Sequence, residues 1–499
     1  MTRMPAFRSI ALVSAAALLS GCLVGPNYVR PTVSTPTAFK EAAGWAPAAP
    51  ADAAPRGDWW VVLNDPVLND LERQVEVSNQ NLAAAEAAYR QSRAMVSEQR
   101  AALFPTVDLT GSATRSSSHS AIVVPPTGGT GTGTGATVAG AHNQYQLGVG
   151  ASWEPDLWGR IRRTVEGAGA QAEASAADLA NARLSAQSQL AVDYVQMRAD
   201  DGLIALLDLT AEGYQRSLTI AQNRYNAGIA AKNDVLTAQT QLANAQAQAV
   251  DLGQQRAQLE HAIAVLTGQP PANLTLQPTA WSLAVPVEPV GVPSTILQRR
   301  PDIASSERLV ANANAQIGVQ TAAYFPSLTL SGQYGVSSSS LGNLFSASST
   351  LWSLGANVAE TLLDFGARKA RVAEARAAYD QTVAQYRQTV LTAFQEVEDA
   401  LAAQRVLSQE APLRQQASQA ADQAETIALN QYKAGIADYT TVVVAQVAAQ
   451  NARQSYLTLQ SNRIVAALDL VKALGGGWAP TGPGGLTDPV PPPPPAPAG

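Results

Sequence analysis

The side chain with the clearest chemistry is the thiol of Cys22, the only cysteine in the chain. It follows Leu19-Ser20-Gly21 at the end of the apolar residues 10–19, and Arg3 and Arg8 precede that run. This order of basic, apolar and small residues is typical of a bacterial secretion signal, and the small residue before the cysteine predicts cleavage there and attachment of diacylglycerol to the sulfur. A single lipid group anchors a protein weakly, so we expect a second membrane contact elsewhere. An ordinary secretion signal with an incidental cysteine is the alternative interpretation.

The other side chains that support catalysis or ligand binding lack the spacing that such sites need. His119, His142 and His261 are scattered through the chain, and no serine or cysteine stands in a nucleophile motif. The glycine-rich residues 128–135 are not followed by the Gly-Lys-Ser or Gly-Lys-Thr of a phosphate-binding loop. A formal charge of −6 without a basic cluster argues against a nucleic-acid partner. We therefore predict that the protein is not an enzyme and holds no cofactor or metal ion.

Several segments of the chain occur twice in similar form. Residues 78–83 align with residues 299–304, and Phe104-Pro105 aligns with Phe325-Pro326, both 221 positions further on. Tyr225-Asn226-Ala227-Gly228-Ile229 aligns with Tyr432-Lys433-Ala434-Gly435-Ile436, 207 positions further on. The offset changes within the Gly/Thr-rich residues 127–140, where an insertion in a loop costs least. Similarity at a fixed offset indicates a duplicated structural unit.

The duplication divides the chain into five predicted segments. Residues 1–21 form the signal, residues 22–66 an extended lipidated segment, residues 67–290 and 291–475 the two repeats, and residues 476–499 a disordered tail rich in proline and glycine. Each repeat is predicted to contain a helix, two strands and two long helices in that order. Pro301 and Asp302 mark the start of the first helix in the second repeat, because proline and an acid favour the first turn.

Apolar and polar residues alternate in two segments of each repeat, the pattern of strands with one apolar face. The apolar positions are Val107, Leu109, Tyr145, Leu147, Val149 and Trp153 in the first repeat, and Leu328, Leu330, Tyr334, Val336, Trp352, Leu354, Ala356 and Val358 in the second. Such strands are typical of transmembrane barrels, and no apolar stretch long enough for a spanning helix follows the signal. Four strands are too few to close a barrel, so we expect several copies of the chain to share one.

Long stretches that favour helix follow each strand pair. Residues 160–225 contain no proline and residues 367–432 contain only Pro412, and a helix of this length reaches about 100 Å. The return helices carry the seven-residue spacing of coiled coils, at Leu252, Leu259 and Leu266 and at Leu457, Ile464 and Val471. The predicted fold class is α+β: a shared transmembrane β-barrel, with four strands per chain, continued by long helices and built from an internal two-fold repeat.

Taken together, these motifs resemble the TolC-like outer membrane factors, in particular their lipoprotein branch with NodT-type members. The resemblance rests on the lipidation motif followed by Gly25-Pro26-Asn27-Tyr28 and Arg30-Pro31, on Arg299-Arg300-Pro301-Asp302-Ile303, on both Phe-Pro strand starts and on both Tyr-x-x-Gly breaks. It implies a homotrimer that contacts outer-membrane lipid and extends a helical barrel into the periplasm. It also implies a passive conduit of RND-type efflux systems, docked to a periplasmic adaptor and an inner-membrane transporter, that exports drugs and toxic organics.

The resemblance assigns roles to the breaks between the long helices. Tip turns and adaptor contacts are expected at Tyr225, Ala227, Gly228, Tyr432, Ala434 and Gly435. Tyr432 aligns with a gating tyrosine of the family and Asp234 with an aspartate of the adjacent coil, whereas the position of the partner arginine holds Ala437. The positions of the family's acidic ring hold Thr441 and Val444, which argues against a cation-binding ring.

Two ways of closing the tip stay open at this point. Polar bridges through Asp234 and Tyr432 are one, and a water-excluding constriction by Val442, Val443 and Val444 is the other. Valines in such a cluster are more often core residues of the coil.

Four aromatic residues, Trp153, Trp158, Trp352 and Phe365, are expected at the membrane interface of the strands. Trp158 and Phe365 are interpreted as strand ends, and the basic residues after them as the rim of the barrel or, almost equally, as a solvated helix start: Arg160, Arg162, Arg163, Arg368, Lys369 and Arg371. The main alternative function is a trimeric coiled-coil lipoprotein with a structural role and no transport activity. A lipoprotein that binds a soluble ligand is a weaker alternative, because it needs a compact pocket and shorter helices.

Overall fold

A computed structural model describes residues 23–33, 39–41, 58–121, 137–285 and 300–476. Cys22, residues 128–135 and the tail beyond residue 476 lie outside the described residues. The chain divides into two compact units, one of residues 1–30, 92–172 and 309–382 and the other of residues 31–91, 173–308 and 383–499. Each unit therefore draws segments from both sequence repeats.

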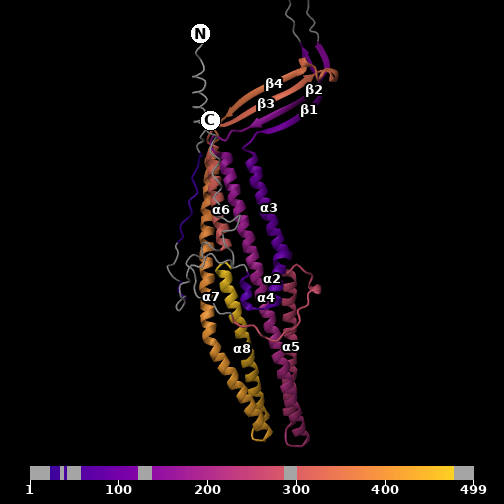
Figure 1. Cartoon of the computed structure of the whole chain (residues 1–499), viewed down its shortest axis with the longest axis vertical. Helices are drawn as coiled ribbons and strands as arrows, with labels where there is room; N and C mark the ends of the chain where they lie inside the picture. The colour runs from indigo at the N-terminus through magenta and orange to yellow at the C-terminus, as the bar shows by residue number, and fades with distance from the viewer. Residues whose placement is uncertain (1–22, 34–38, 42–57, 122–136, 286–299, 477–499) are drawn as a thin grey trace, which may run out of the picture. The chain divides into compact units, whose positions relative to one another are not determined.

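Helices and strands follow the predicted order in each repeat, except that two helices, where one was predicted, precede the strands of the first repeat (Figure 1). The first repeat contains α2 (Pro66–Ser78), α3 (Gln80–Ala101), β1 (Thr106–Ala121), β2 (Thr137–Trp153), α4 (Arg160–Asn226) and α5 (Lys232–Leu266). The second contains α6 (Pro301–Ala322), β3 (Ser327–Ser338), β4 (Thr350–Ala359), α7 (Ala367–Lys433) and α8 (Tyr439–Ala473). Short 3-10 turns η1 (Trp59–Leu63), η2 (Pro271–Asn273), η4 (Leu341–Asn343) and η5 (Ala347–Ser349) complete the described elements. The predicted strands and long helices are confirmed.

The internal repeat extends to the ends of the helices. α4 and α7 each have 67 residues, and α5 and α8 each have 35. Their bounds differ by 207 positions at both ends, whereas the bounds of α3 and α6 differ by 221. Pro412 lies inside α7, where its ring replaces one backbone N–H donor. No described helix is both long enough and apolar enough to cross a membrane.

The four strands form one antiparallel sheet in the order β1-β2-β3-β4. Val107 lies opposite Ala151 in the first strand pair, and Leu328 lies opposite Val358 in the second. The second pair of positions is the first pair shifted by 221 and 207, so both repeats use the same register. β2 and β3 join the repeats, with Ala151 opposite Gly332.

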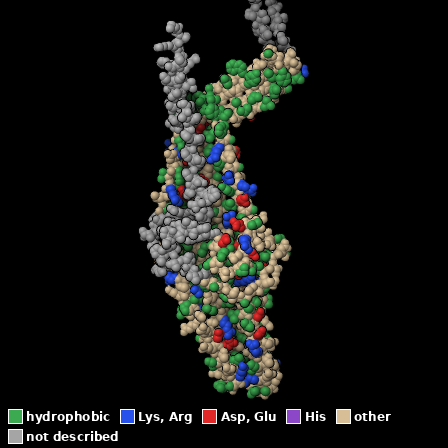
Figure 2. Space-filling model, in the orientation of Figure 1, with side chains coloured by type: hydrophobic (Ala, Val, Ile, Leu, Met, Phe, Trp, Pro, Cys, Tyr) green, Lys and Arg blue, Asp and Glu red, His purple; other side chains and the backbone are tan. Residues whose placement is uncertain are grey.

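Large apolar side chains remain exposed on this sheet. Hydrophobic side chains spread over its visible face in Figure 2. The exposed positions on the strands include Val107, Leu109, Val149, Trp153, Tyr334, Trp352, Leu354 and Val358. Leu354 is 81% exposed and Trp352 is 72% exposed, which is unusual for side chains of this size in water. The sheet therefore presents an apolar surface that the described residues do not cover.

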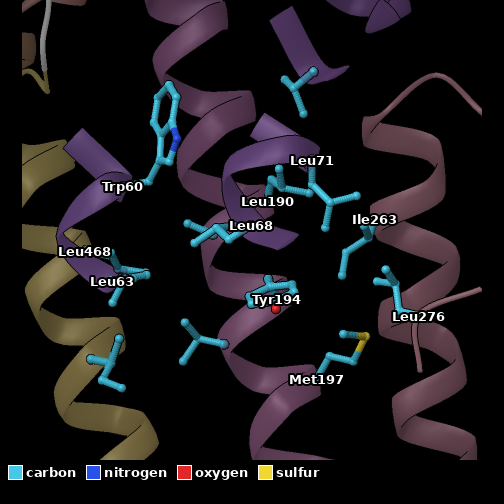
Figure 3. Close-up of a cluster of buried hydrophobic side chains, with 14 of the residues drawn as sticks. Trp60, Leu63, Leu68, Leu71, Leu190, Tyr194, Met197, Ile263, Leu276 and Leu468 are labelled. Carbon is cyan, nitrogen blue, oxygen red and sulfur yellow. The ribbon is translucent and has the colours of Figure 1, made fainter. Parts of the chain in front are cut away.

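The second unit has a hydrophobic core between its helices. Leu68 and Leu71 of α2 pack with Leu190 of α4, Ile263 of α5 and Leu468 of α8 (Figure 3). Trp60 and Leu63 of η1 are 4% and 6% exposed and join this core. The prediction of a wholly extended segment 22–66 is wrong at η1, because its apolar side chains gain more from a turn that buries them.

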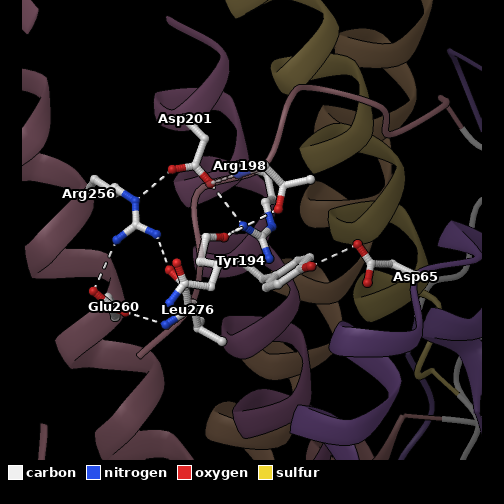
Figure 4. Close-up of polar contacts among 9 residues, drawn as sticks. Asp65, Tyr194, Arg198, Asp201, Arg256, Glu260 and Leu276 are labelled. Carbon is white, nitrogen blue, oxygen red and sulfur yellow. Dashed lines mark hydrogen bonds and ion pairs between the residues drawn. The ribbon is translucent and has the colours of Figure 1, made fainter. Parts of the chain in front are cut away.

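A network of charged side chains holds the connection after α5 (Figure 4). Asp201 Oδ2 accepts from Arg198 Nη1 at 2.9 Å, and its Oδ1 accepts from Arg256 Nε at 2.6 Å. Arg198 also donates to the carbonyl of Gln277 at 2.8 Å, and Arg256 donates to the carbonyl of Leu276. The network fixes an irregular segment against α4 and α5, because its backbone carbonyls have no strand or helix to pair with.

Candidate functional site

The two breaks between long helices are tight turns of the same geometry. Gly228 and Gly435 have φ angles of 73° and 75°, which glycine adopts without strain. The Gly228 N–H donates to the Tyr225 carbonyl at 2.9 Å, and the Gly435 N–H donates to the Tyr432 carbonyl at 3.0 Å. These bonds pair the last carbonyls of α4 and α7 and let the chain reverse within a few residues.

The residues expected at the tip lie in or beside these turns. They are Tyr225, Ala227 and Gly228 after α4, and Tyr432, Ala434 and Gly435 after α7. Tyr225 is 40% exposed, whereas Tyr432 is 2% exposed. Contact of these turns with an adaptor stays a prediction.

The helices that follow the turns start differently in the two repeats. In the second, Asp438 Oδ1 accepts from the Thr441 N–H at 3.0 Å and from the Thr441 hydroxyl at 2.7 Å. These hydrogen bonds lower the pKa of Asp438. In the first, Ala231 precedes α5 and makes no side-chain cap, and Asp234 lies in the first turn. Thr441, expected among the gate residues, is thus engaged in a helix cap.

Tyr432 is the centre of a cluster that joins both hairpins. Its ring centroid lies 5.2 Å from that of Tyr439, and its hydroxyl lies 3.5 Å from Asp234 Oδ2. Ala221 of α4, Ala238 of α5 and Val442 of α8 pack around the two rings. Burial, and then the Asp234 carboxylate, raise the pKa of Tyr432. The expected pair of Asp234 and Tyr432 therefore meets within one chain, although the hydrogen bond between them is long.

The guanidinium of an arginine that the sequence motifs did not single out also contacts this cluster. Arg224, in the last turn of α4, donates from Nη1 to the Tyr432 carbonyl at 3.0 Å. Its guanidinium also lies 4.8 Å from the centre of the Tyr432 ring. Ala437, the position expected for an arginine, has only a methyl side chain and donates no side-chain hydrogen bond. Arg224 could be identified from the sequence, because it directly precedes Tyr225 and a cation suits the C-terminal turn of a helix.

The three valines proposed as a constriction do not act as one group in this chain. Val442 is fully buried among the tyrosines, Val443 packs against the same cluster, and Val444 is 65% exposed. Successive helical residues point in different directions, so three in a row cannot line one surface. Val442 is a core residue, and a constriction by Val444 stays a prediction.

A ladder of hydrogen-bonded polar side chains, buried except for Gln248, lies between the same hairpins. The Tyr214 hydroxyl donates to Gln450 Oε1 at 3.0 Å, and Gln450 Nε2 donates to Gln248 Oε1 at 2.8 Å. Gln446 Nε2 donates to Ser217 Oγ at 3.0 Å, and both side chains are at most 2% exposed. Burial and the Glu425 carboxylate raise the pKa of Tyr214 to about 12. Buried hydrogen bonds of this kind specify one register between packed helices.

The aromatic residues of the strand region have different environments. Trp153 is 37% exposed and its Nε1 donates to the Leu103 carbonyl at 3.0 Å, whereas Trp352 is largely exposed. Trp158 stacks on Phe325 at 4.8 Å and donates from Nε1 to the Pro326 carbonyl at 2.8 Å. Phe365, its counterpart, is 92% exposed at a φ of 51°.

The interpretation of Trp158 and Phe365 as strand ends is wrong. β2 ends at Trp153 and β4 ends at Ala359, and both residues lie in the connections to the long helices. Asp156 accepts from the N–H groups of Ile161 and Arg162, and Asp364 accepts from those of Gly366 and Arg368. These carboxylates cap the helix starts, which draws the preceding residues out of the sheet.

Arg163 also departs from expectation, because it is 1% exposed. Its guanidinium donates to the carbonyls of Val24 and Gly25, each at 3.3 Å, and to Asn27 Oδ1 at 2.9 Å. Neither a membrane rim nor a solvated helix start describes it. The arginine instead holds the segment that directly follows Cys22.

The described ranges were also searched for groups that could hold a metal ion through their side chains. No group of three or more His, Cys, Asp or Glu residues among them is placed to hold a metal ion. The described features of interest are therefore the exposed sheet and the tip of the helix hairpins.

Comparison with known proteins identifies relatives over nearly the whole chain. Residues 71–269 and 292–476 match the sequence model of a family described as outer membrane efflux protein. The matched segments start 221 and end 207 positions apart, the offsets of the internal repeat. The chain is 31% identical over 474 residues to the toluene efflux pump outer membrane protein TtgC of Pseudomonas putida, covering 94% of this chain and 95% of that protein.

Two solved structures have the same fold. The outer-membrane channel OprN matches with a TM-score of 0.83 and 29% identity, over 92% of this chain and 100% of that chain. The CmeC outer membrane channel of Campylobacter jejuni matches with a TM-score of 0.84 and 25% identity, over 93% and 97% of the two chains. Both are channels that combine long helices with a small sheet, as this chain does.

Proposed function

Because the chain belongs to the outer membrane efflux protein family, we propose that it is the outer-membrane duct of a tripartite efflux pump. In this proposal three copies form a passive conduit that docks to a periplasmic adaptor and an RND-type inner-membrane transporter. The cargo is small organic molecules, the class to which the toluene exported by the relative from Pseudomonas putida belongs. The protein itself performs no chemical reaction.

The observation that carries this proposal is the incomplete sheet. In the described part of the chain, β1 and β4 each pair on one side only, and their apolar side chains are exposed. An open strand edge beside an apolar surface is unstable in water and favours pairing with another strand. The apolar surface suits membrane lipid, and the free edges suit neighbouring copies of the chain, so that the strands of three copies close one barrel.

The repeat predicts how two copies meet. Ala151 lies opposite Gly332 where the first repeat meets the second. The same offsets place Val358 of β4 opposite Gly111 of β1 in the next copy. Phe365 lies in the connection that follows β4. In the proposed trimer it contacts Phe104 of the next copy, in the same way that Trp158 stacks on Phe325 within the chain. Phe365 and Phe104 are 92% and 69% exposed in the single chain, which leaves both rings available for this contact.

A lipid on Cys22 completes the proposal. The next residues, Val24 to Gly25, are held by the buried Arg163, and the Val24 N–H donates to the Trp158 carbonyl at 3.2 Å. The proposed lipid on Cys22 directly precedes this fixed segment in the chain. Mass spectrometry of the purified protein tests this, with Cys22→Ala as the control that lacks the diacylglycerol mass.

Single-channel conductance in planar bilayers tests the duct. Detergent-purified trimers should show small, brief currents that increase when Asp234→Ala is combined with Tyr432→Phe. Asp251→Ala, at an exposed position of α5, serves as the control and should leave the currents unchanged. Intact trimers without any pore would reject the duct and favour the structural coiled-coil lipoprotein.

Cysteine cross-linking tests the contact between copies. Val358→Cys with Gly111→Cys should give a disulfide-linked trimer, because opposed residues of antiparallel strands have Cα atoms roughly 4.5–5.5 Å apart. Val358→Cys with Ala113→Cys, shifted by two residues on the same face, is the matched control and should link poorly. Equal linking of both pairs would contradict the register.

A further inference from the structure

A cavity of about 180 Å³ lies where three strands meet the helices, and all of it belongs to one compact unit. β2 and β4 end beside it, and β3 begins beside it. Its walls come from the connection between β2 and α4, the connection between α6 and β3, and the residues that follow β4. The cavity is separate from the tip of the helix hairpins and has no part in the contacts proposed between copies.

Contacts among the three segments fix the walls of this cavity. Trp158 stacks on Phe325 with ring centroids 4.8 Å apart, and its Nε1 donates to the Pro326 carbonyl at 2.8 Å. The Ser327 hydroxyl donates to the Ala359 carbonyl at 3.3 Å, which joins the start of β3 to the end of β4. The cavity is therefore formed in the chain itself, as binding sites for small groups usually are.

The charges on the wall do not balance. Asp156 caps α4 and also accepts from Arg162 Nε at 3.2 Å, and Glu154 Oε2 accepts from Arg160 Nη2 at 2.8 Å. Glu360 lines the cavity too, but it has no hydrogen bond or ion pair with any residue that the structure describes. One negative charge on the wall is thus left for a cationic group from outside.

The surroundings of the cavity indicate where that group comes from. Leu328 lines the cavity and lies opposite Val358, which belongs to the exposed apolar face of the sheet. On the Trp158 side, a Cβ added to Gly159 would lie 2.6 Å from Leu23 Cδ1, and Leu23 directly follows Cys22. In the proposed duct both features place the cavity at the membrane surface. A carboxylate that loses water there needs a cationic partner.

We infer that the cavity binds the head group of a phospholipid with a primary ammonium, which Glu360 recognises, while the acyl chains follow the apolar face of the sheet. A primary ammonium donates three hydrogen bonds, and its bonds to a carboxylate are strengthened by charge. Arg160 uses one of its five donors on Glu154 and is 45% exposed, so the others are available to the lipid phosphate. A choline head group has the same charge, but its trimethylammonium donates no hydrogen bond. The inference rests on the proposed place in the outer membrane and adds a lipid that is selected there.

The internal repeat predicts one such site per chain. The offset of 207 positions places Thr361 where Glu154 stands, and Trp153 of the next copy where Glu360 stands. The equivalent place between two copies therefore lacks the carboxylate that recognises the ammonium. A trimer should bind three selected lipids rather than six.

Native mass spectrometry of the purified, delipidated protein tests this site. Phosphatidylethanolamine and phosphatidylcholine with identical acyl chains are added in equal amounts, and wild type should bind the first about tenfold more tightly. Glu360→Gln should reduce this preference to about twofold or less, because the amide carries no charge. Glu360→Asp keeps the carboxylate and should keep part of the preference. Glu374→Gln, at an exposed position of α7 outside the cavity, is the matched control and should keep all of it.

The outcomes separate the lipid site from the duct. Equal binding of the two lipids by wild type, or an unchanged preference in Glu360→Gln, would overturn the inference. Displacement of the lipid by free ethanolamine at equal concentration would show a site for soluble amines and would also overturn it. Trimers that keep the preference but open no pore in planar bilayers would reject the duct alone, and conducting trimers without the preference would reject the lipid site alone.

Discussion

Replacing Glu72 with glutamine is expected to change the pH dependence of stability. Glu72 lies on α2, is 0% exposed, and its two carboxylate oxygens have no hydrogen-bond partner among the described residues. Burial raises the pKa of this carboxyl from 4.5 to about 9. Leu68, Leu71 and Val75 on the same helix are buried too, which explains the low polarity around it.

The sign of the effect follows from proton binding. Between pH 4.5 and about 9 the folded chain keeps the Glu72 proton, whereas the unfolded chain releases it. The free energy of unfolding therefore falls as pH rises through this range, by about 1.4 kcal/mol per pH unit. The glutamine side chain has nearly the same shape as that of glutamate, but it does not titrate. The stability advantage of Glu72→Gln over wild type should thus grow by about 2.7 kcal/mol from pH 5.5 to pH 7.5.

Urea unfolding followed by far-ultraviolet circular dichroism measures this difference at several pH values. Glu76→Gln is the control, because the Glu76 side chain is 51% exposed and faces Arg183 at 3.5 Å. It should shift stability little and without a pH trend of this size. Parallel pH profiles for Glu72→Gln and wild type would refute the burial of an unpaired carboxyl.

Two further substitutions test the scaffold of the tip and of the second unit by the same urea measurement. Arg256→Met should lower the free energy of unfolding by about 3 kcal/mol, because it leaves the buried carboxylate of Asp201 without one of its cations. Arg216→Met, whose side chain is 71% exposed, should change it by less than about 0.5 kcal/mol, and equal losses would contradict the network. Gly228→Ala should cost about 1 kcal/mol, because its φ of 73° strains any Cβ. Gly253→Ala, with no atom within 4 Å of the added Cβ in the single chain, should instead stabilise α5 by about 0.5–1 kcal/mol, and a neutral Gly228→Ala would refute the strained turn.

The repeat, the strands and the long helices are readable from the sequence because each depends on local patterns. Alternation of apolar residues from Val107 onward marks the strands, and absence of proline over residues 160–225 marks α4. The Tyr-x-x-Gly motifs mark the turns, since glycine alone enters the left-handed region freely. The two strand pairs have the same register when the residue numbers of their first and second strands are shifted by 221 and 207 positions.

The partners of individual polar side chains depend on the tertiary structure. Arg163 and Arg224 lie in the first and last turns of α4, yet one binds the carbonyls of Val24 and Gly25 and the other binds that of Tyr432 at the end of α7. Trp158 lies outside the sheet, in the connection where the Asp156 carboxylate caps the start of α4. Local periodicity assigns a residue to an element and a face, but burial and hydrogen-bond partners are set by segments more than a hundred residues away, which only the folded chain brings together.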